Sequence, residues 1–360
     1  MVLREKIETV RVNMISQWQN ILIQISLHLN KPLNKPTSII FNLTSSCVLR
    51  CKHCDIWKNP PTKHLSYQES KVLIDKLYSW LGSCYIFFTG GEPLMNKDLP
   101  KIVGYANRKG ILSHINSSAV LINDKVAQKF LDNHLFAISI SIDGSTKKSH
   151  DYLRGRTGTF DRAVQAIKYL QELPSSQKPK IYINTVMMKD NIKELESLVK
   201  FATKHNTDGI MFQCLLPNLA AKGKQITHQE NPLWPKTNEM VRVLKKLIKL
   251  SKSDKIILTS PEDLELAIQY YQNPHFLDSI TCAAGINNFI IDHNGDVRLC
   301  FKFDPIGNLF KESPTEIWWG KKAQAQRPII RRCKQNCKII ACNKADTKRI
   351  KTTLFTKLFG

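Results

Sequence analysis

CVLRCKHC, residues 47–54, places three cysteines within eight residues. The segment directly follows a short run of β-branched and apolar residues, 38–43, which predicts the first strand of the fold. Three thiolates ligate three irons of a [4Fe–4S] cube and leave the fourth iron without a protein ligand. Structural zinc is the alternative, and it would need a fourth ligand such as His53 or His64.

Strands and helices alternate on the C-terminal side of this segment. The strands are predicted at 38–43, 85–89, 112–116, 136–142, 180–186 and 209–215, and the helices at 66–81, 98–109, 123–133, 160–173 and 191–205. Such alternation is typical of parallel βαβ units. We therefore expect an α/β fold with a partial (β/α)6 barrel, half-closed or closed, whose chemistry lies at the carboxyl ends of the strands.

A second motif ends the second predicted strand, at Gly90-Gly91-Glu92-Pro93. Adjacent glycines let the backbone come close to a ligand, and a carboxylate accepts hydrogen bonds from a protonated amine. Together with Cys47, Cys51 and Cys54, this motif resembles the radical S-adenosylmethionine (SAM) superfamily. His53 is a departure, because the family usually has an aromatic residue just before the third cysteine.

The resemblance implies a [4Fe–4S] cluster whose open iron binds SAM and, once reduced, cleaves it to a 5′-deoxyadenosyl radical. It also implies roles for strand-end residues. Gly90, Gly91, Glu92 and Pro93 are expected to hold the SAM amino group, and Asn116, Ser117 and Ser141 to contact the ribose or methionyl part. Arg154 resembles the arginine that pairs with the SAM carboxylate, and Asn184 is a weaker candidate.

The remaining five clustered cysteines lie near the C-terminus, at Cys282, Cys300, Cys333, Cys337 and Cys342. The first two bracket a predicted hairpin at 289–301, whose Asn294-Gly295 pair suits a tight turn. The pattern resembles the SPASM and shorter twitch domains. Because a full SPASM domain has seven cysteines, we expect one auxiliary [4Fe–4S] cluster, held by Cys282, Cys300 and two of the last three. Zinc remains the alternative here too. Cys84 and Cys214 are interpreted as small hydrophobic residues.

These features divide the chain into five predicted parts. They are an N-terminal helix and linker (1–36), the radical SAM core (37–235), a helical connection (236–281) with helices at 237–253 and 261–272, the auxiliary cluster domain (282–342) and a basic tail (343–360).

The chain is strongly basic, with 53 Lys and Arg against 30 Asp and Glu and a net charge of +23. Such a surface attracts nucleic acid, anionic lipid or acidic peptides. Nucleic acid is not the expected partner, because the sequence contains no recognisable nucleic-acid-binding module. The pattern over 4–29 predicts an amphipathic helix, which either packs onto the core or lies on an anionic membrane.

The sequence contains no run apolar enough to span a bilayer and no signal peptide. We expect a cytoplasmic protein with reduced thiols, with peripheral membrane contact as the alternative.

The predicted function is that of a radical SAM oxidoreductase or maturase. It is expected to abstract hydrogen from a peptide or protein residue, with a donor such as flavodoxin or ferredoxin supplying the electron. The alternatives are a radical dehydrogenase acting on a sugar, aminocyclitol or lipid-linked molecule, and a metal-containing protein that only binds nucleic acid. No catalytic acid or base is predicted, because nothing in the sequence marks one.

Overall fold

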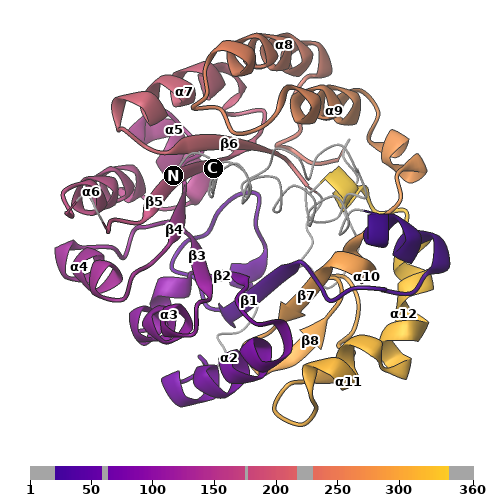
Figure 1. Ribbon diagram of the computed structural model, residues 1–360. Coiled ribbons are helices and arrows are strands. Elements are labelled where there is room, and N and C mark those ends of the chain that lie inside the picture. The colour runs from indigo at the N-terminus through magenta and orange to yellow at the C-terminus, as the bar shows by residue number, and fades with distance from the viewer. Residues whose placement is uncertain (1–20, 59–63, 175–176, 217–229, 340–360) are drawn as a thin grey trace, which may run out of the picture.

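Six parallel strands with helices on their outer side form the N-terminal part of the computed structural model (Figure 1). The structure describes residues 21–58, 64–174, 177–216 and 230–339. The strands are β1 (Ser38–Thr44), β2 (Tyr85–Gly90), β3 (Leu112–Ser117), β4 (Ala137–Ser141), β5 (Lys180–Met187) and β6 (Gly209–Cys214). Neighbouring strands pair in chain order, which confirms the predicted βαβ architecture.

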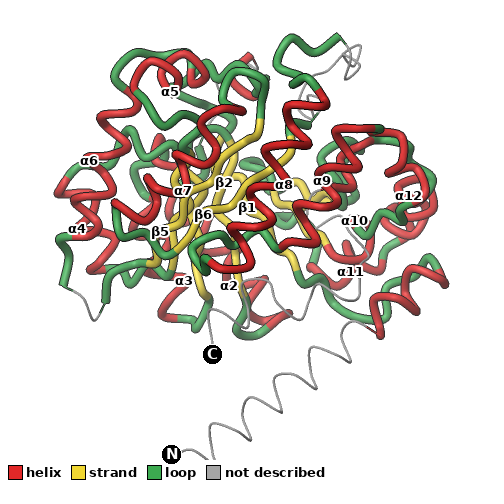
Figure 2. Tube along the Cα trace, turned by 90° about the horizontal axis from the view of Figure 1, so that it is seen from above, coloured by secondary structure: helices red, strands yellow, loops and turns green. Residues whose placement is uncertain are grey.

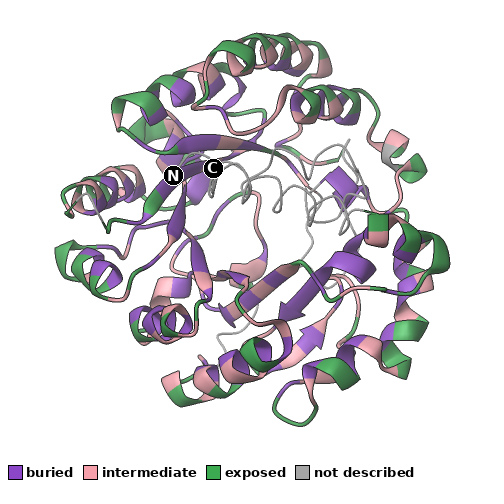
Figure 3. Ribbon diagram, viewed as in Figure 1, coloured by how far each residue is buried: buried purple, intermediate pink, exposed green. Residues whose placement is uncertain are grey.

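Helices cover the outer face of this sheet, and the strands lie inside them (Figure 2). They are α2 (Tyr67–Leu81), α3 (Leu99–Arg108), α4 (Asp124–Asp132), α5 (Lys147–Arg154), α6 (Thr159–Gln171) and α7 (Leu195–Lys204), the last preceded by the 3-10 turn η3 (Ile192–Glu194). Alternate strand residues such as Phe41, Phe88 and Ile138 are fully buried in the core between sheet and helices. Figure 3 shows this burial, with the outer faces of the helices exposed.

The C-terminal part continues the same sheet. Strand β7 (Asn288–Ile291) pairs parallel to β1, and β8 (Asp296–Arg298) and β9 (Gly307–Asn308) follow in antiparallel order. The full order is β6-β5-β4-β3-β2-β1-β7-β8-β9, so the sheet is an open arc with β6 and β9 at its ends. The predicted partial barrel and its hairpin domain are confirmed, and the barrel is open.

The remaining helices follow the sixth strand. They are α8 (Thr237–Ser253), α9 (Pro261–Gln272), α10 (Ala284–Asn287), α11 (Pro314–Trp319) and α12 (Lys321–Arg331), with 3-10 turns η4 (Pro274–Ser279) and η5 (Asn336–Ile339). Helices α8 and α9 agree with the prediction. Helices α5, α10, α11 and α12 were not predicted.

The N-terminal helix is described from residue 21 and ends at residue 29. Ile23 and Leu27 are buried against Ala283 and Ile286, which lie at α10. Arg331 bonds the carbonyls of Leu27 and His28. This end of the helix therefore packs onto the protein, whereas Ile21, Ile25 and Leu29 on its other side are exposed. Residues 4–20 of the predicted helix lie outside the described residues.

Among the helices that the structure describes, none combines the length and apolar character needed to cross a bilayer.

Candidate functional site

The three-cysteine segment lies in the loop that leaves β1, as the sequence predicted. Cys51 is buried, and Cys47 and Cys54 are half-buried beside it, packed with Leu49 and Val120. Burial raises the pKa of Cys47 to about 11 and also raises that of Cys54. Buried thiols become thiolates when a nearby positive centre compensates for lost solvation, and an iron cluster is such a centre. The three donors therefore fit a cluster ligated by sulfur.

The end of β2 lies against the cysteine loop. The Gly91 and Glu92 amides donate hydrogen bonds to the carbonyls of Thr44 and Ser46, each at 2.8 Å. A Cβ atom on Gly90 would collide with the Thr44 carbonyl, and one on Gly91 with the Ser46 carbonyl. The paired glycines are therefore required for the close approach of these two strand ends.

Glu92 connects β2 to the end of β3. Its side chain is only 1% exposed. One carboxylate oxygen accepts a hydrogen bond from the Ser117 hydroxyl at 2.6 Å, and the other accepts from the Ser118 amide at 2.9 Å. The structure thus brings Glu92 and Ser117 together, and it fixes the carboxylate before any ligand arrives.

Arg154 ends α5 directly behind the cysteine loop. Its guanidinium forms a buried ion pair with Asp143 at 2.8 Å, and its Nη1 lies 3.7 Å from the Cys51 sulfur. The Arg50 amide donates a hydrogen bond to the Arg154 carbonyl, so α5 also supports the loop backbone. The sequence indicated Arg154 but not its pairing with Asp143, because that contact joins segments with no local pattern in common.

His53 lies in the same buried group, with Nδ1 3.8 Å from an Asp143 oxygen. Burial lowers its pKa to about 4; Asp143 opposes this shift and Arg154 adds to it. His53 is therefore neutral at pH 7. The other predicted residues of this region, Asn116 and Ser141, lie half-buried at the ends of β3 and β4.

The second cysteine group assembles from three distant segments. Cys282 precedes α10, Cys300 follows β8, and Cys333 and Cys337 follow α12. Burial raises the pKa of Cys337 to about 12, and negative charge on Cys300, Cys282 and Cys333 would raise it further. The four thiols therefore lie close enough for their charges to interact, and four thiolates are a donor set that suits a sulfur-ligated metal group. Cys342 lies outside the described residues.

No trio of His, Cys, Asp or Glu within the described ranges is arranged to hold a single metal ion. A cubane does not require such convergence, because each thiolate binds a different iron. Cys84 and Cys214 pack at the edge of the main core, as their interpretation as small hydrophobic residues predicted.

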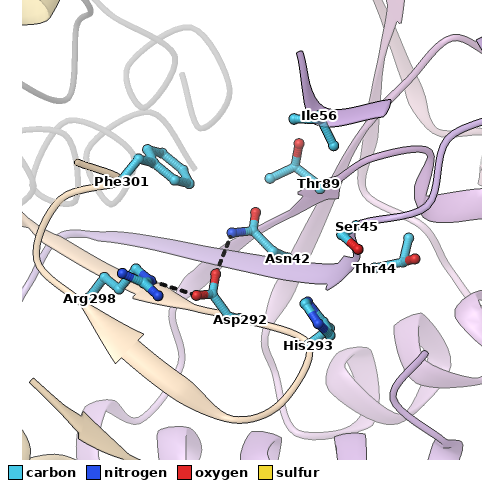
Figure 4. A pocket seen from close by; sticks show the side chains of 10 residues that line it. Asn42, Thr44, Ser45, Ile56, Thr89, Asp292, His293, Arg298 and Phe301 are labelled. Atoms are coloured by element: carbon cyan, nitrogen blue, oxygen red, sulfur yellow. Dashed lines mark hydrogen bonds and ion pairs between the residues drawn. The ribbon is translucent and has the colours of Figure 1, made fainter. Parts of the chain in front are cut away.

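A cavity of about 350 Å³ lies between the first strands and the C-terminal hairpin (Figure 4). Its lining comes from both parts of the chain, namely Asn42, Thr44, Ser45, Ile56, Thr89, Gly90, Asp292, His293, Arg298 and Phe301. Asp292 accepts hydrogen bonds from Asn42 at 3.0 Å and from Arg298 at 2.7 Å. Sequence reasoning found the hairpin but missed Asp292, His293 and Arg298, because only the pairing of β7 with β1 brings them to this cavity.

Known proteins resemble the chain in two regions. Residues 41–202 match the radical SAM superfamily, and residues 282–343 match SPASM, an iron–sulfur cluster-binding domain. The Fe-coproporphyrin III synthase of Methanosarcina barkeri is 30% identical over 60% of this chain and 53% of its own length. The mycofactocin maturase of Mycobacterium tuberculosis is 28% identical over 74% of this chain and 65% of its own length. The chain thus spans about half the length of the first relative and somewhat less than two thirds of the second.

Among solved structures, SuiB of Streptococcus suis bound to S-adenosylmethionine superposes with a TM-score of 0.65. The match covers 84% of this chain and 70% of that chain at 16% identity, so it bears on the fold alone.

Proposed function

Because this chain belongs to the radical SAM superfamily and carries a SPASM domain, we propose that it oxidatively modifies a peptide or protein residue, starting with hydrogen abstraction. The family membership makes it an enzyme that uses SAM and a [4Fe–4S] cluster, with auxiliary iron–sulfur binding in the SPASM domain. The substrate and the reaction product are the proposed part.

We assign the SAM-cleaving cluster to Cys47, Cys51 and Cys54. When bound, this cluster supplies the electron that cleaves SAM and so generates the 5′-deoxyadenosyl group that takes hydrogen from substrate. The Gly90 to Pro93 segment supports this assignment, because its backbone is bonded to the cysteine loop. Asn116, Ser117, Ser141 and Arg154 complete the proposed SAM site, and Arg154 has the further role of placing positive charge beside Cys51.

We assign the auxiliary cluster to Cys282, Cys300, Cys333 and Cys337. Their assembly from three segments supports this choice. Held by these residues, a second cluster would supply an acceptor for the electron that remains after hydrogen abstraction. Such a group favours net oxidation or bond formation as the outcome.

The observation that carries the proposal is the cavity itself. It is lined on one side by Thr44 and Gly90 beside the SAM motifs, and on the other by Arg298 and Phe301 next to Cys300. A substrate group in this space would contact the end of β2 that carries the proposed SAM motif and the segment that follows Cys300. About 350 Å³ suits an amino-acid side chain or a short peptide segment at the lower end of ligand-pocket sizes. SuiB, which shares the fold, has also been solved bound to its precursor peptide SuiA.

A heme-type macrocycle is the second candidate substrate, favoured by the relative named for Fe-coproporphyrin III synthesis. Arg298 lines the cavity and is already paired with Asp292, so a carboxylate on such a molecule would share this guanidinium with Asp292.

An anaerobic assay with SAM, a chemical reductant and each candidate substrate separates these candidates. The peptide proposal predicts that peptides stimulate formation of 5′-deoxyadenosine and lose hydrogen, as read by mass spectrometry. Stimulation by coproporphyrin but by no peptide would replace it with the second candidate. A flavodoxin or ferredoxin is the proposed natural electron donor, and it should replace the chemical reductant in this assay.

The exposed side chains of Ile21, Ile25 and Leu29 keep a peripheral membrane contact open as a proposal. Cosedimentation with anionic liposomes that is lost on deleting residues 1–30 would support it, and no binding by the full chain would end it.

A further inference from the structure

Lys338 is a lysine buried among the auxiliary cysteines. It lies in η5, directly after Cys337, and is only 3% exposed. Its charge acts to lower the pKa of Cys282, whereas burial and the neighbouring thiols raise that pKa. Lysines are rarely buried to this extent in proteins. The placement therefore puts a buried positive charge next to Cys337 in the chain and within electrostatic reach of Cys282.

The other nearby lysines are in a different environment. Lys334 follows Cys333 just as Lys338 follows Cys337, but its side chain is exposed. The charge of Lys302 acts to lower the pKa of Cys300, and the Lys302 side chain is half-buried. Solvent and salt screen an exposed charge far more than a buried one. Among the described lysines of this group, Lys338 should therefore act most strongly on anything the thiols hold.

The surroundings of the four thiols oppose added negative charge. Burial is the largest cause of the raised pKa of Cys282, Cys300 and Cys337. One-electron reduction of a thiolate-ligated cluster likewise adds one negative charge within this buried volume. The net charge and hydrogen bonding around a cluster set its reduction potential. A buried ammonium group favours the reduced state, because it offsets the added charge.

We propose that Lys338 raises the reduction potential of the auxiliary [4Fe–4S] cluster and thereby makes that cluster an electron acceptor. The proposal rests on the proposed function, in that Cys282, Cys300, Cys333 and Cys337 must hold the cluster. Lys338 acts through the cluster's electrostatics and does not ligate iron. In the proposed reaction the electron comes from the substrate radical, and the same electron can be supplied in vitro by a chemical reductant.

The test is a redox titration of the auxiliary cluster followed by electron paramagnetic resonance. The full chain is reconstituted with Cys47, Cys51 and Cys54 changed to Ala, so that one cluster gives the signal. In this background Lys338→Met should make the midpoint potential of the cluster more negative by at least about 59 mV. This shift is a tenfold change in the equilibrium constant of a one-electron couple. Lys338→Arg keeps the charge and should stay near the parent. Lys334→Met, the exposed counterpart, should also stay near the parent.

Counting iron tests whether the four cysteines hold a cluster separately from whether Lys338 raises its potential. About four irons per chain in the parent background establish the cluster, and their absence would refute the proposed function before Lys338 is tested. With the cluster present, an unchanged potential in Lys338→Met, or an equal shift in Lys334→Met, would overturn the role of Lys338. If Lys338→Met loses its iron, Lys338→Gln carries the same prediction, since it removes the charge and keeps a polar side chain.

Discussion

Glu92 joins two strand ends, a structural role that its sequence motif did not indicate. The sequence marked it as a ligand for an amine, yet its carboxylate already accepts hydrogen bonds from Ser117 and Ser118. Both oxygens therefore help to join the ends of β2 and β3. A carboxylate held in this way is preorganised for a cationic ligand, because no rearrangement is needed when the ligand binds.

Changing Glu92 to Ala should affect both stability and ligand binding. The buried donors of Ser117 and Ser118 would lose their acceptor, which costs about 3 kcal/mol in the free energy of unfolding. SAM binding, measured by calorimetry on the anaerobic protein, should be lost in the same variant. Glu262 is exposed in the first turn of α9, and Glu262→Ala should change stability by less than about 0.5 kcal/mol. Wild-type SAM affinity in Glu92→Ala would contradict the proposed SAM site.

His114 gives the protein a predictable sensitivity to acid. It is 1% exposed in β3, and its ring nitrogens bond the Tyr85 hydroxyl and, at 2.7 Å, the Ser139 hydroxyl. Burial lowers its pKa from the ordinary 6.5 to about 3. Below pH 6.5 the unfolded chain therefore gains a proton that the folded chain does not, so stability falls as the pH drops toward 3.

Between about pH 7 and about pH 5, this single group should cost about 2 kcal/mol of unfolding free energy. Urea unfolding at the two pH values should show that His114→Asn loses about that much less than the wild type. Acid affects the clusters of both proteins alike, so this effect cancels when the two losses of unfolding free energy are subtracted. The exposed His275 is the control, and His275→Asn should lose as much as the wild type. An equal loss in His114→Asn would show that His114 is not held neutral.

Single residues were predicted where their signal is local. Cys47, Cys51 and Cys54 lie within one loop, and Gly90 to Glu92 within one turn, so local motifs were enough to propose them as site residues. The pairing of Arg154 with Asp143 and the burial of Lys338 depend on contacts between distant segments. No local pattern encodes such contacts.

The strands followed from short β-branched or aromatic runs, and most helices followed from periodicity. The predicted bounds of the six core strands differ from the observed ones by one residue at most. Strand β4 shows why alternation is not the signal, because four consecutive residues, Ala137–Ile140, are buried. Helix α12 was missed because it contains Pro328 and is rich in basic residues, which weakens any apolar repeat. Helix α5 was missed because only His150, Leu153 and Arg154 of its eight residues are buried.

The N-terminal helix has one buried and one exposed leucine close together, so the contribution of its packing to stability can be measured. Leu27 is 5% exposed against Ala283 and Ile286, whereas Leu29, two residues later, is 55% exposed. Leu27→Ala should therefore lower the unfolding free energy by about 2 kcal/mol, and Leu29→Ala by less than about 0.5 kcal/mol. Chemical denaturation of the two variants measures this difference. Equal effects would mean that this helix does not pack on the C-terminal part as described.

The pairing of β1 with β7 joins the N-terminal and C-terminal parts of the molecule. This pairing makes one sheet of the radical SAM core and the SPASM hairpin, and it creates the cavity between them. The sequence predicted both parts and their order. It did not predict their junction, because strand pairing across some 250 residues is decided by the fit of the two surfaces.

Two separate cysteine sets are proposed to hold two clusters, of which only the first cleaves SAM. The most direct measurement counts iron, acid-labile sulfide and 5′-deoxyadenosine in two reconstituted variants. With Cys47, Cys51 and Cys54 changed to Ala, the account predicts about four irons and no 5′-deoxyadenosine. With Cys282 and Cys300 changed to Ala, it predicts about four irons and continued SAM cleavage under reduction. Iron near zero with zinc in its place in the first variant, or 5′-deoxyadenosine still formed there, would contradict it.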